Sequence, residues 1–392
     1  MMEHTKWMLP EIALPRLRRT RRSLLLFALA AFICAGGGHV FAATCHAHAQ
    51  TAPTPPAQNG AQSGAHNFDF NIGVWHTHIQ RVLDPLSSST ESLTLDGTVT
   101  VRKIWNGQAE LEEIEADGPK GHMEGMSLFL YNPAARQWSQ TYISSKSGDV
   151  AAPLIGAFHD GRGELFSEDT FKGKTILVRG EWSGIQQDSH RYQEFYSGDG
   201  GQTWHSAFLA DLTRDQQAAA QDGSAIADPP PPDPTVAGQQ DFAFDIGTWR
   251  THSSRLLHPL TGSHTWVDLD GTTVVKPIWG GRANLAEYQA NGDGGPIQLL
   301  SLRWFNPATH EWNLDFATPQ VGTLGIPGVG AFKNGRADFY DYEPIGGRSI
   351  LVRFSIWKIT DDTAQSEQAF SEDGGQTWEV NWINHYTRMK TD

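Results

Sequence analysis

The chain has 392 residues, a formal net charge of −14 and only two cysteines. The acidic excess argues against nucleic acid as a partner, because phosphate backbones are bound by clustered lysine and arginine, and it also argues against an anionic membrane surface. The chain contains 14 Trp, 19 Phe, 8 Tyr and 40 Gly, a composition that favours strands joined by tight turns.

The N-terminus has the pattern of an export signal. Five arginines between positions 16 and 22 precede an apolar stretch, residues 23–35, which is shorter than the ~20 residues that a membrane-spanning helix needs. Residues 1–42 are predicted to be a signal peptide, cleaved after export by either the Sec or the twin-arginine route. Residues 43–66 are rich in Ala, Gln, Pro and Gly and are predicted to be a disordered tether. We therefore expect a periplasmic or secreted protein without a membrane span.

The rest of the chain is one unit that occurs twice. The sequence FDFNIGVW at residues 68–75 recurs as FAFDIGTW at residues 242–249, and the offset of 174 residues holds without a gap as far as Arg214 and Arg388. This predicts two domains, residues 67–214 and 241–388, each long enough to bury its own core. Residues 215–240 form the linker, whose four consecutive prolines predict a stiff spacer.

Strand patterns dominate both copies. In the first copy, alternating or apolar stretches occupy residues 98–104, 126–131, 137–143, 163–167, 175–182, 191–197 and 203–209. Turn sequences such as Asn132-Pro133 separate them, and the second copy repeats the plan. Eight to ten strands with short connections predict an all-β fold of two tandem antiparallel up-and-down β-barrels, because barrel closure removes exposed strand edges.

Each copy begins with a Gly-x-Trp sequence and ends with an arginine. The pairs are Gly73-x-Trp75 with Arg214, and Gly247-x-Trp249 with Arg388. This arrangement resembles the lipocalin and calycin superfamily, in which a Gly-x-Trp on the first strand closes one end of the barrel under a basic residue that follows the last strand. The resemblance implies that Arg214 lies over Trp75 and Arg388 over Trp249, with a structural role. A partly desolvated contact of this kind contributes about 1–2 kcal/mol.

Further motifs narrow the resemblance. F-x-F-x-I-G-x-W, N-P-x-x-x-x-W, I-L-V-R and S-x-D-G-G-x-T-W follow one another in the same order in both copies. Together they are similar to an uncharacterised bacterial family of calycin-like domains of unknown function. The second copy fits better, with Arg303-Trp304 where the first has Phe129-Leu130. The resemblance implies a fold and no catalytic residues.

The S-x-D-G-G-x-T-W sequence also resembles the Asp-box of sialidase-like propellers. It runs from Ser197 to Trp204 and from Ser371 to Trp378, so it recurs only once in 174 residues, whereas a propeller has one in each blade of roughly 50 residues. We expect a hairpin turn with a structural role. Glycoside hydrolysis needs two suitably spaced carboxylates, and no such repeated pair is evident.

Several polar and aromatic residues retained in both copies are candidate ligand contacts. Arg179 and Arg353 each end an apolar Ile-Leu-Val stretch. An arginine that faces a barrel lumen must be paired or must meet an anion. It would anchor the acidic end of a ligand, form an ion pair with Glu113 or Glu287, or lie on a solvated strand face. Four retained tryptophans would either pack the core or line a ligand cavity: Trp105, Trp279, Trp138 and Trp312.

These residues predict an exported tandem barrel that binds a small apolar or amphiphilic ligand in one or both lumens. Two alternatives stay open: an isomerase or hydrolase with Glu113 or Glu287 as a base, and a structural module whose barrels contact each other or a partner. The sequence contains no zinc-protease, paired-cysteine, nucleophile-elbow or Walker pattern, and we expect neither a metal nor a cofactor. The ligand should enter opposite the Gly-x-Trp end.

Overall fold

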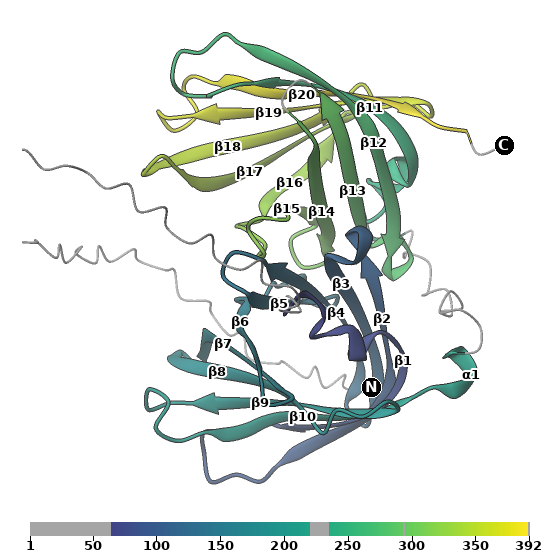
Figure 1. Cartoon of the computed structure of the whole chain (residues 1–392), viewed down its shortest axis with the longest axis vertical. Coiled ribbons are helices and arrows are strands. Elements are labelled where there is room, and N and C mark those ends of the chain that lie inside the picture. Colours follow the sequence, from purple (N-terminus) through teal and green to yellow (C-terminus); the bar gives the residue numbers. More distant parts are fainter. Residues whose placement is uncertain (1–63, 220–234, 293–294, 391–392) are drawn as a thin grey trace, which may run out of the picture. The chain divides into compact units, whose positions relative to one another are not determined.

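The computed structural model describes residues 64–219, 235–292 and 295–390. They form two closed antiparallel barrels, each of ten strands in up-and-down order (Figure 1). This confirms the all-β fold class and the tandem barrels predicted from the sequence. The predicted signal peptide, residues 43–63 of the predicted tether and the four prolines of the linker lie outside the described residues.

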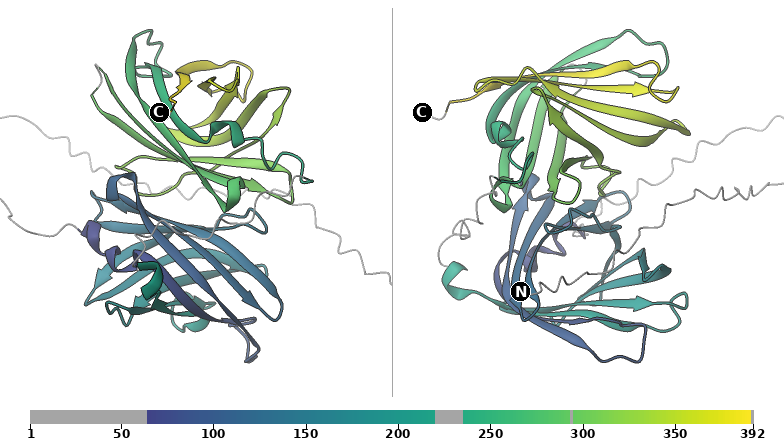
Figure 2. Two further views of the ribbon diagram at one scale, coloured as in Figure 1. Left: turned by 90° about the vertical axis from the view of Figure 1, so that its right-hand side faces the viewer. Right: turned by 180° about the vertical axis from the view of Figure 1, so that it is seen from behind.

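Each strand pairs with its neighbour in the sequence, and the last strand pairs with the first (Figure 2). The first barrel consists of β1 (Gly73–Val82), β2 (Ser92–Ile104), β3 (Ala109–Gly118), β4 (Gly121–Asn132), β5 (Gln137–Ser144), β6 (Leu154–His159), β7 (Arg162–Phe171), β8 (Lys174–Ser183), β9 (Ser189–Ser197) and β10 (His205–Arg214). The second consists of β11 (Gly247–Leu256), β12 (Trp266–Ile278), β13 (Ala283–Gly292), β14 (Ile297–Asn306), β15 (Glu311–Ala317), β16 (Gly328–Lys333), β17 (Arg336–Ile345), β18 (Arg348–Trp357), β19 (Thr363–Ser371) and β20 (Glu379–Arg388).

Helices are short and lie at the ends of strands. They are the 3₁₀ helices η1 (Gly64–His66), η2 (Asp69–Asn71), η3 (Trp105–Gly107), η4 (Ala243–Asp245) and η5 (Trp279–Gly281), and the α-helix α1 (Gln216–Ala219). Within the described ranges, no helix is both long and apolar enough to cross a membrane.

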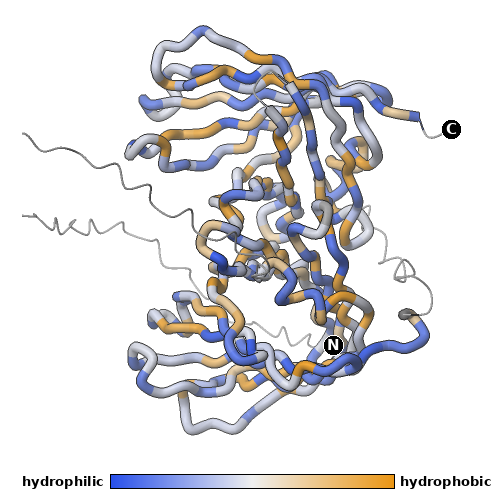
Figure 3. Tube along the Cα trace, in the orientation of Figure 1, coloured by the Kyte–Doolittle hydropathy of each residue, from blue (hydrophilic) through white to orange (hydrophobic). Residues whose placement is uncertain are grey.

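The two faces of each strand differ in polarity. Along β1, Trp75, Thr77 and Ile79 are buried, whereas the residues between them are exposed. Successive side chains of a strand point to opposite faces, so this alternation sets which residues line the lumen. Figure 3 shows the resulting change between hydrophobic and hydrophilic residues along the strands.

The segment that precedes the first strand fills one end of each barrel. Phe68 is fully buried, and its ring centroid lies 4.8 Å from that of Phe129, 4.8 Å from Phe158 and 5.0 Å from Trp182. Phe242 is packed in the same way in the second barrel, 4.8 Å from Trp312. Edge-to-face contacts of this kind add to the effect of burial. The F-x-F part of the opening motif therefore closes the barrel end.

The predicted arginine–tryptophan contacts are present at this end. The Arg214 guanidinium lies 3.9 Å from the centroid of the Trp75 ring, and Arg388 lies 4.0 Å from Trp249. Arg214 also donates hydrogen bonds to three backbone carbonyl oxygens, those of Phe70 (3.2 Å), Ile72 (2.9 Å) and Gln187 (2.9 Å). One side chain thus joins three parts of the barrel: the segment before β1 that fills the barrel end, which we call the plug, the start of β1, and the turn before β9.

The two barrels lie within one compact unit and share a hydrophobic cluster. Its members from the outer faces of β2–β5 recur, 174 residues later, in β12–β15, as with Leu111 and Leu285. Trp304 donates its indole N–H to the Gly148 carbonyl (2.9 Å), and Ser139 donates to the Gly322 carbonyl (2.7 Å). The structure therefore contains a contact between the barrels, which the sequence left open as one alternative.

An ion pair and two glycines complete this interface. Arg282 donates two hydrogen bonds to the Glu124 carboxylate, at 2.6 and 2.7 Å. A Cβ added at Gly148 would lie 2.6 Å from the Asn306 backbone, and one added at Gly322 would lie 2.7 Å from the Asn132 backbone. The close approach is thus reciprocal between the two copies.

We predict that Gly73→Ala destabilises the first barrel by roughly 2 kcal/mol or more. Gly73 has φ +132°, and an added Cβ would lie 2.4 Å from Nη1 of Arg214. The measurement is the midpoint of thermal unfolding. Gly173→Ala is the matched control, since Gly173 also has a positive φ (+77°) but no atom within 4 Å of the added Cβ. Equal shifts in the two variants would show that crowding against Arg214 is not the cause.

Candidate functional site

The first barrel contains a cavity of about 350 Å³ in its lumen. Apolar side chains from all around the barrel line it, among them Val99, Ile114, Leu154, Val178, Trp182, Ala210 and Leu212. The polar lining consists of Arg81, Glu112, Ser127, Gln140, Tyr142, Asp169, His190, Tyr192, Glu194 and Tyr196.

The cavity extends away from the plugged end. His190 lies at its base, with a ring centroid 4.4 Å from that of Trp75. Arg81 lies near the far end of β1 and is exposed, and Phe171 lies at the far end of β7. The expectation that a ligand enters opposite the Gly-x-Trp motif agrees with this geometry.

Two groups of polar side chains face one another across the lumen. Glu112, Ser127 and Tyr142 occupy adjacent positions on β3, β4 and β5. Tyr192 and Glu194 follow one another on the inner face of β9, and the Tyr192 hydroxyl donates a hydrogen bond to Glu194 at 3.2 Å. Tyr196 continues the same row.

Burial perturbs both lumen carboxyl groups. It raises the pKa of Glu112 above its ordinary value, and hydrogen bonds from Asn71 and Ser127 offset this only in part. It also raises the pKa of Glu194, against the opposing effects of hydrogen bonds from Tyr196 and Tyr192. Across the described residues, neither Glu112 nor Glu194 forms an ion pair with lysine or arginine.

The base of the cavity is neutral at physiological pH. Burial lowers the pKa of His190 to about 4, and the nearby positive charge of Arg214 lowers it further. Burial also raises the pKa of Tyr192 well above its ordinary value. Charge in the lumen is therefore confined to the carboxyl groups and to Arg81 at the mouth.

The second barrel has a smaller cavity, of about 170 Å³. A hydrogen-bonded network runs along its wall on the adjacent strands β11, β20 and β19: Ser253 donates to Asn384 (2.6 Å), Asn384 donates to Ser366 (2.9 Å), and the Trp382 indole donates to Asn384 (2.8 Å). Trp382 takes the place of Phe208. The lining also includes Glu343, and Ser301 and Arg303, whose Oγ and Nε atoms have no hydrogen-bond partner among the described residues.

The two lumens have diverged at the residues that make the first one acidic. At the 174-residue offset, Glu112 is replaced by Ala286 and Glu194 by Gln368. The tyrosines are replaced too: Tyr142 by Phe316, Tyr192 by Ser366 and Tyr196 by Phe370. The same fold therefore forms without either carboxyl group.

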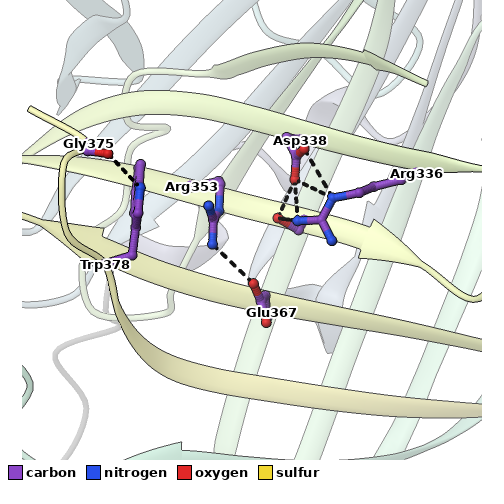
Figure 4. Close-up of polar contacts among 7 residues, drawn as sticks. Arg336, Asp338, Arg353, Glu367, Gly375 and Trp378 are labelled. Carbon is purple, nitrogen blue, oxygen red and sulfur yellow. Dashed lines mark hydrogen bonds and ion pairs between the residues drawn. The ribbon is translucent and has the colours of Figure 1, made fainter. Parts of the chain in front are cut away.

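Arg179 and Arg353 do not face the lumen, contrary to one reading of the sequence. Their neighbours Val178 and Val352 are buried inside, so the arginines project from the outer face. The Arg179 guanidinium lies 4.9 Å from the Trp204 ring centroid, and Arg353 lies 4.5 Å from Trp378. Figure 4 shows Arg353 between Trp378 and Glu367, to which it donates a hydrogen bond (3.2 Å). Both arginines brace the Asp-box turns.

The Asp-box sequences form hairpin turns held by hydrogen bonds to their aspartates, as the sequence predicts. Asp199 accepts backbone hydrogen bonds from Gln202 (3.0 Å) and Thr203 (2.9 Å), and Asp373 accepts the equivalent bonds in the second copy. The hydroxyl and amide of Thr377 hold the pKa of Asp373 at about 2.

Glu113 and Glu287 also lie on outer faces. Glu113 pairs with Arg102 rather than with Arg179. Its cross-strand neighbour Met126, like Leu300 opposite Glu287, belongs to the cluster between the barrels. The predicted lumen pair of a glutamate and an arginine is therefore wrong for both copies, because each residue sits one position away from the inward-facing one.

The four retained tryptophans separate into two pairs. Trp105 and Trp279 belong to the cluster shared by the barrels and do not line either lumen cavity. Trp138 and Trp312 pack in the barrel interiors beside the plugs, and each donates its indole N–H to a glycine carbonyl, Gly64 (2.7 Å) and Gly238 (2.8 Å). All four pack in hydrophobic cores, and none belongs to the lining of either lumen cavity.

Sequence reasoning missed the acidic lumen because it searched for residues kept in both copies. The signal was present in one copy alone. Tyr192, Glu194 and Tyr196 alternate along a single strand, a pattern that places all three on one face. Glu112 would have been found by fixing the inward parity of β3 from its apolar partners Ile114 and Ala116.

The comparisons with known proteins give only distant structural likenesses. No family model and no curated protein sequence matches the chain.

Similar solved structures include an S-type phycobiliprotein lyase from Guillardia theta, with a TM-score of 0.30, 11% identity, and coverage of 39% of this chain and 92% of the lyase. A DUF3598-family protein of unknown function from Nostoc punctiforme has a TM-score of 0.24, 10% identity, and coverage of 84% and 100%. A transferrin binding protein B from Haemophilus parasuis has a TM-score of 0.16, 8% identity, and coverage of 81% and 76%. At these values they say nothing of the chain's activity.

One further carboxyl group lies deeper in the first barrel. Glu110 is 1% exposed, and its Oε2 has no hydrogen-bond partner within the described ranges. Burial and then the negative charge of Asp69 raise its pKa to about 9. In the second barrel this position is Asn284, which accepts a hydrogen bond from Arg303 (3.2 Å), whereas the first barrel has Phe129 in place of that arginine.

We predict that Glu110→Gln stabilises the protein by roughly 1–3 kcal/mol at pH 8. A carboxyl group whose pKa is raised in the folded state holds its proton there, so the unfolded state is favoured increasingly as pH rises from about 4.5 to about 9. The advantage of the variant should therefore vanish below pH 4.5. Unfolding by urea at several pH values measures this.

Glu168→Gln is the control for this prediction, because Glu168 is exposed on β7. It should leave the pH dependence unchanged. Parallel stability curves for the wild type and Glu110→Gln between pH 5 and 9 would contradict a raised pKa at Glu110.

Proposed function

We propose that the first barrel binds a small amphiphilic molecule in its lumen. The observation that carries the proposal is the open cavity of about 350 Å³, with apolar walls and a cluster of polar groups. Ligand pockets commonly have volumes of ~300–1,000 Å³ and a few convergent polar groups. The second barrel, with a cavity of about 170 Å³, is the weaker candidate.

The signal peptide predicted from the sequence of residues 1–42 supports action in the periplasm or outside the cell. The order of the motifs supports membership of the calycin-like bacterial family. A protein of this kind would collect or carry its ligand in that compartment.

A second candidate function is an enzyme that transfers protons inside the first lumen. Glu112 and Glu194 are carboxyl groups with raised pKa values in a cavity, which is the environment of a general acid or base. These two residues replace Glu113 and Glu287 as the candidates for that role.

Lumen binding is tested with the neutral, polarity-sensitive probe N-phenyl-1-naphthylamine. Ala210 lines the cavity between Tyr192 and Ile79, so Ala210→Trp should fill the lumen and weaken probe binding at least about tenfold. Leu209→Trp is the matched control, because Leu209 points to the outer face of the same strand. It should bind the probe like the wild type.

Circular dichroism and the unfolding midpoint establish that both variants are folded. Absence of probe binding by the wild type, or equal binding by Ala210→Trp, would sink the proposal. Native mass spectrometry with lipid extraction identifies any molecule that copurifies.

A further inference from the structure

The lining of the first lumen contains more acidic residues than basic ones. Its ionisable lining comprises Glu112 on β3, Asp169 on β7 and Glu194 on β9, with Arg81 at the exposed mouth. The remaining titratable groups, His190 and the three tyrosines, are neutral at physiological pH. An acidic ligand would find one cation at the mouth and carboxyl groups beyond it.

A barrel of this fold closes without either carboxyl group. The second barrel closes in the same way with Ala286 and Gln368 at these positions. Glu112 accepts a hydrogen bond from Asn71 and Glu194 accepts one from Tyr192, but among the described residues neither forms an ion pair with lysine or arginine. Burying a carboxyl group without a cation destabilises a protein, so acidic residues that barrel closure does not require point to a role in binding.

A second observation is that one buried hydrogen-bond acceptor in the cavity has no donor. The amide of Gln140 is 7% exposed, its nitrogen donates to Ser127 at 3.1 Å, and its Oε1 has no hydrogen-bond partner within the described part of the chain. Gln140 lines the cavity and is next to Ser127, the cross-strand neighbour of Glu112. An unsatisfied buried acceptor in a cavity that also holds two carboxyl groups calls for a donor from the ligand.

Aromatic rings complete the surroundings. Tyr192 and Tyr196 flank Glu194 on the inner face of β9, and Tyr142 is the neighbour of Ser127 on β5. Ring faces attract cations by roughly 0.5–2 kcal/mol each, more strongly where water is excluded. Carboxyl groups among tyrosines therefore favour a positively charged nitrogen, and apolar walls favour a hydrocarbon body.

Resting on the proposed lumen function, we propose that the ligand of the first barrel is an organic amine. Its ammonium group lies between Glu112 and Glu194 within the three tyrosines and donates a hydrogen bond to Oε1 of Gln140. Its apolar part lies against the aliphatic lining. The second barrel, without these acids, does not share this preference.

Binding should strengthen as pH rises. Burial favours the protonated form of Glu112 and Glu194 in the free protein, and the ammonium group pairs only with the ionised form. Arg81 and Asp169 also face the cavity. Affinity should increase through the carboxyl pKa values and fall only where the amine loses its own proton, near pH ~10.

The test compares three probes with the same hydrocarbon chain: octylamine, octanol and octanoate. Each displaces N-phenyl-1-naphthylamine from the full chain at pH 5.5 and pH 8. Octylamine should bind at least about tenfold more tightly than octanoate at pH 8, and its affinity should fall at pH 5.5.

Variants assign the effect to the two acids. Glu112→Gln with Glu194→Gln should reduce octylamine binding at least about tenfold and leave octanol binding unchanged. Glu113→Gln is the matched control on the outer face of β3 and should behave as the wild type. Octanoate binding as tightly as octylamine, or an octylamine affinity indifferent to the double substitution, overturns the amine proposal while lumen binding stands. Failure of all three probes and of N-phenyl-1-naphthylamine overturns lumen binding itself.

Discussion

The contact of Arg214 with Trp75 is the constraint on which the first barrel depends. A ten-stranded sheet closes only if its first and last strands meet in register, and Trp75 pairs directly with Arg214 across that seam. The guanidinium stacks on the indole and bonds the carbonyls of the segment that plugs the barrel. Gly73 leaves the space that this requires. Arg214 therefore stabilises both the pairing of the first and last strands and the plug. The same arrangement recurs around Arg388.

Because the contacts that close the barrel lie at one end, the residues that line the lumen toward the other end can differ between the two copies. Near the plug the two copies share buried phenylalanines and tryptophans in the same roles. Further along the lumen, the first copy has carboxyl groups and tyrosines, and the second has Trp382 and a network of small polar side chains. The scaffold is thus conserved between the copies where it carries the fold, and it differs where a ligand would be held.

The sequence predicts the fold well because the features that define it are local or repeated. Alternation, turn residues and the recurrence of Gly-x-Trp with a terminal arginine lead directly to two closed barrels. The lumen is harder to predict, because a strand has two faces and an error of one residue exchanges them. Arg179 and Glu113 are candidates for the lumen because both copies retain them, yet each is next to the residue that faces inward, Val178 and Glu112. Retention in both copies selects structural residues here, since the Asp-box brace and the barrel interface are common to both.

The reciprocal contacts between the barrels carry a consequence for the history of the chain. Gly148 approaches Asn306 as Gly322 approaches Asn132, so residue i meets j where j meets i. Such self-complementary pairing is isologous, the geometry of a two-fold homodimer. A single-barrel ancestor that dimerised through this face would have been bound by symmetry to carry two identical lumens. Fusion of two copies in tandem keeps the partner barrel at a high effective concentration. The two copies can then mutate independently, so one lumen can acquire acidic residues while larger side chains occupy the other.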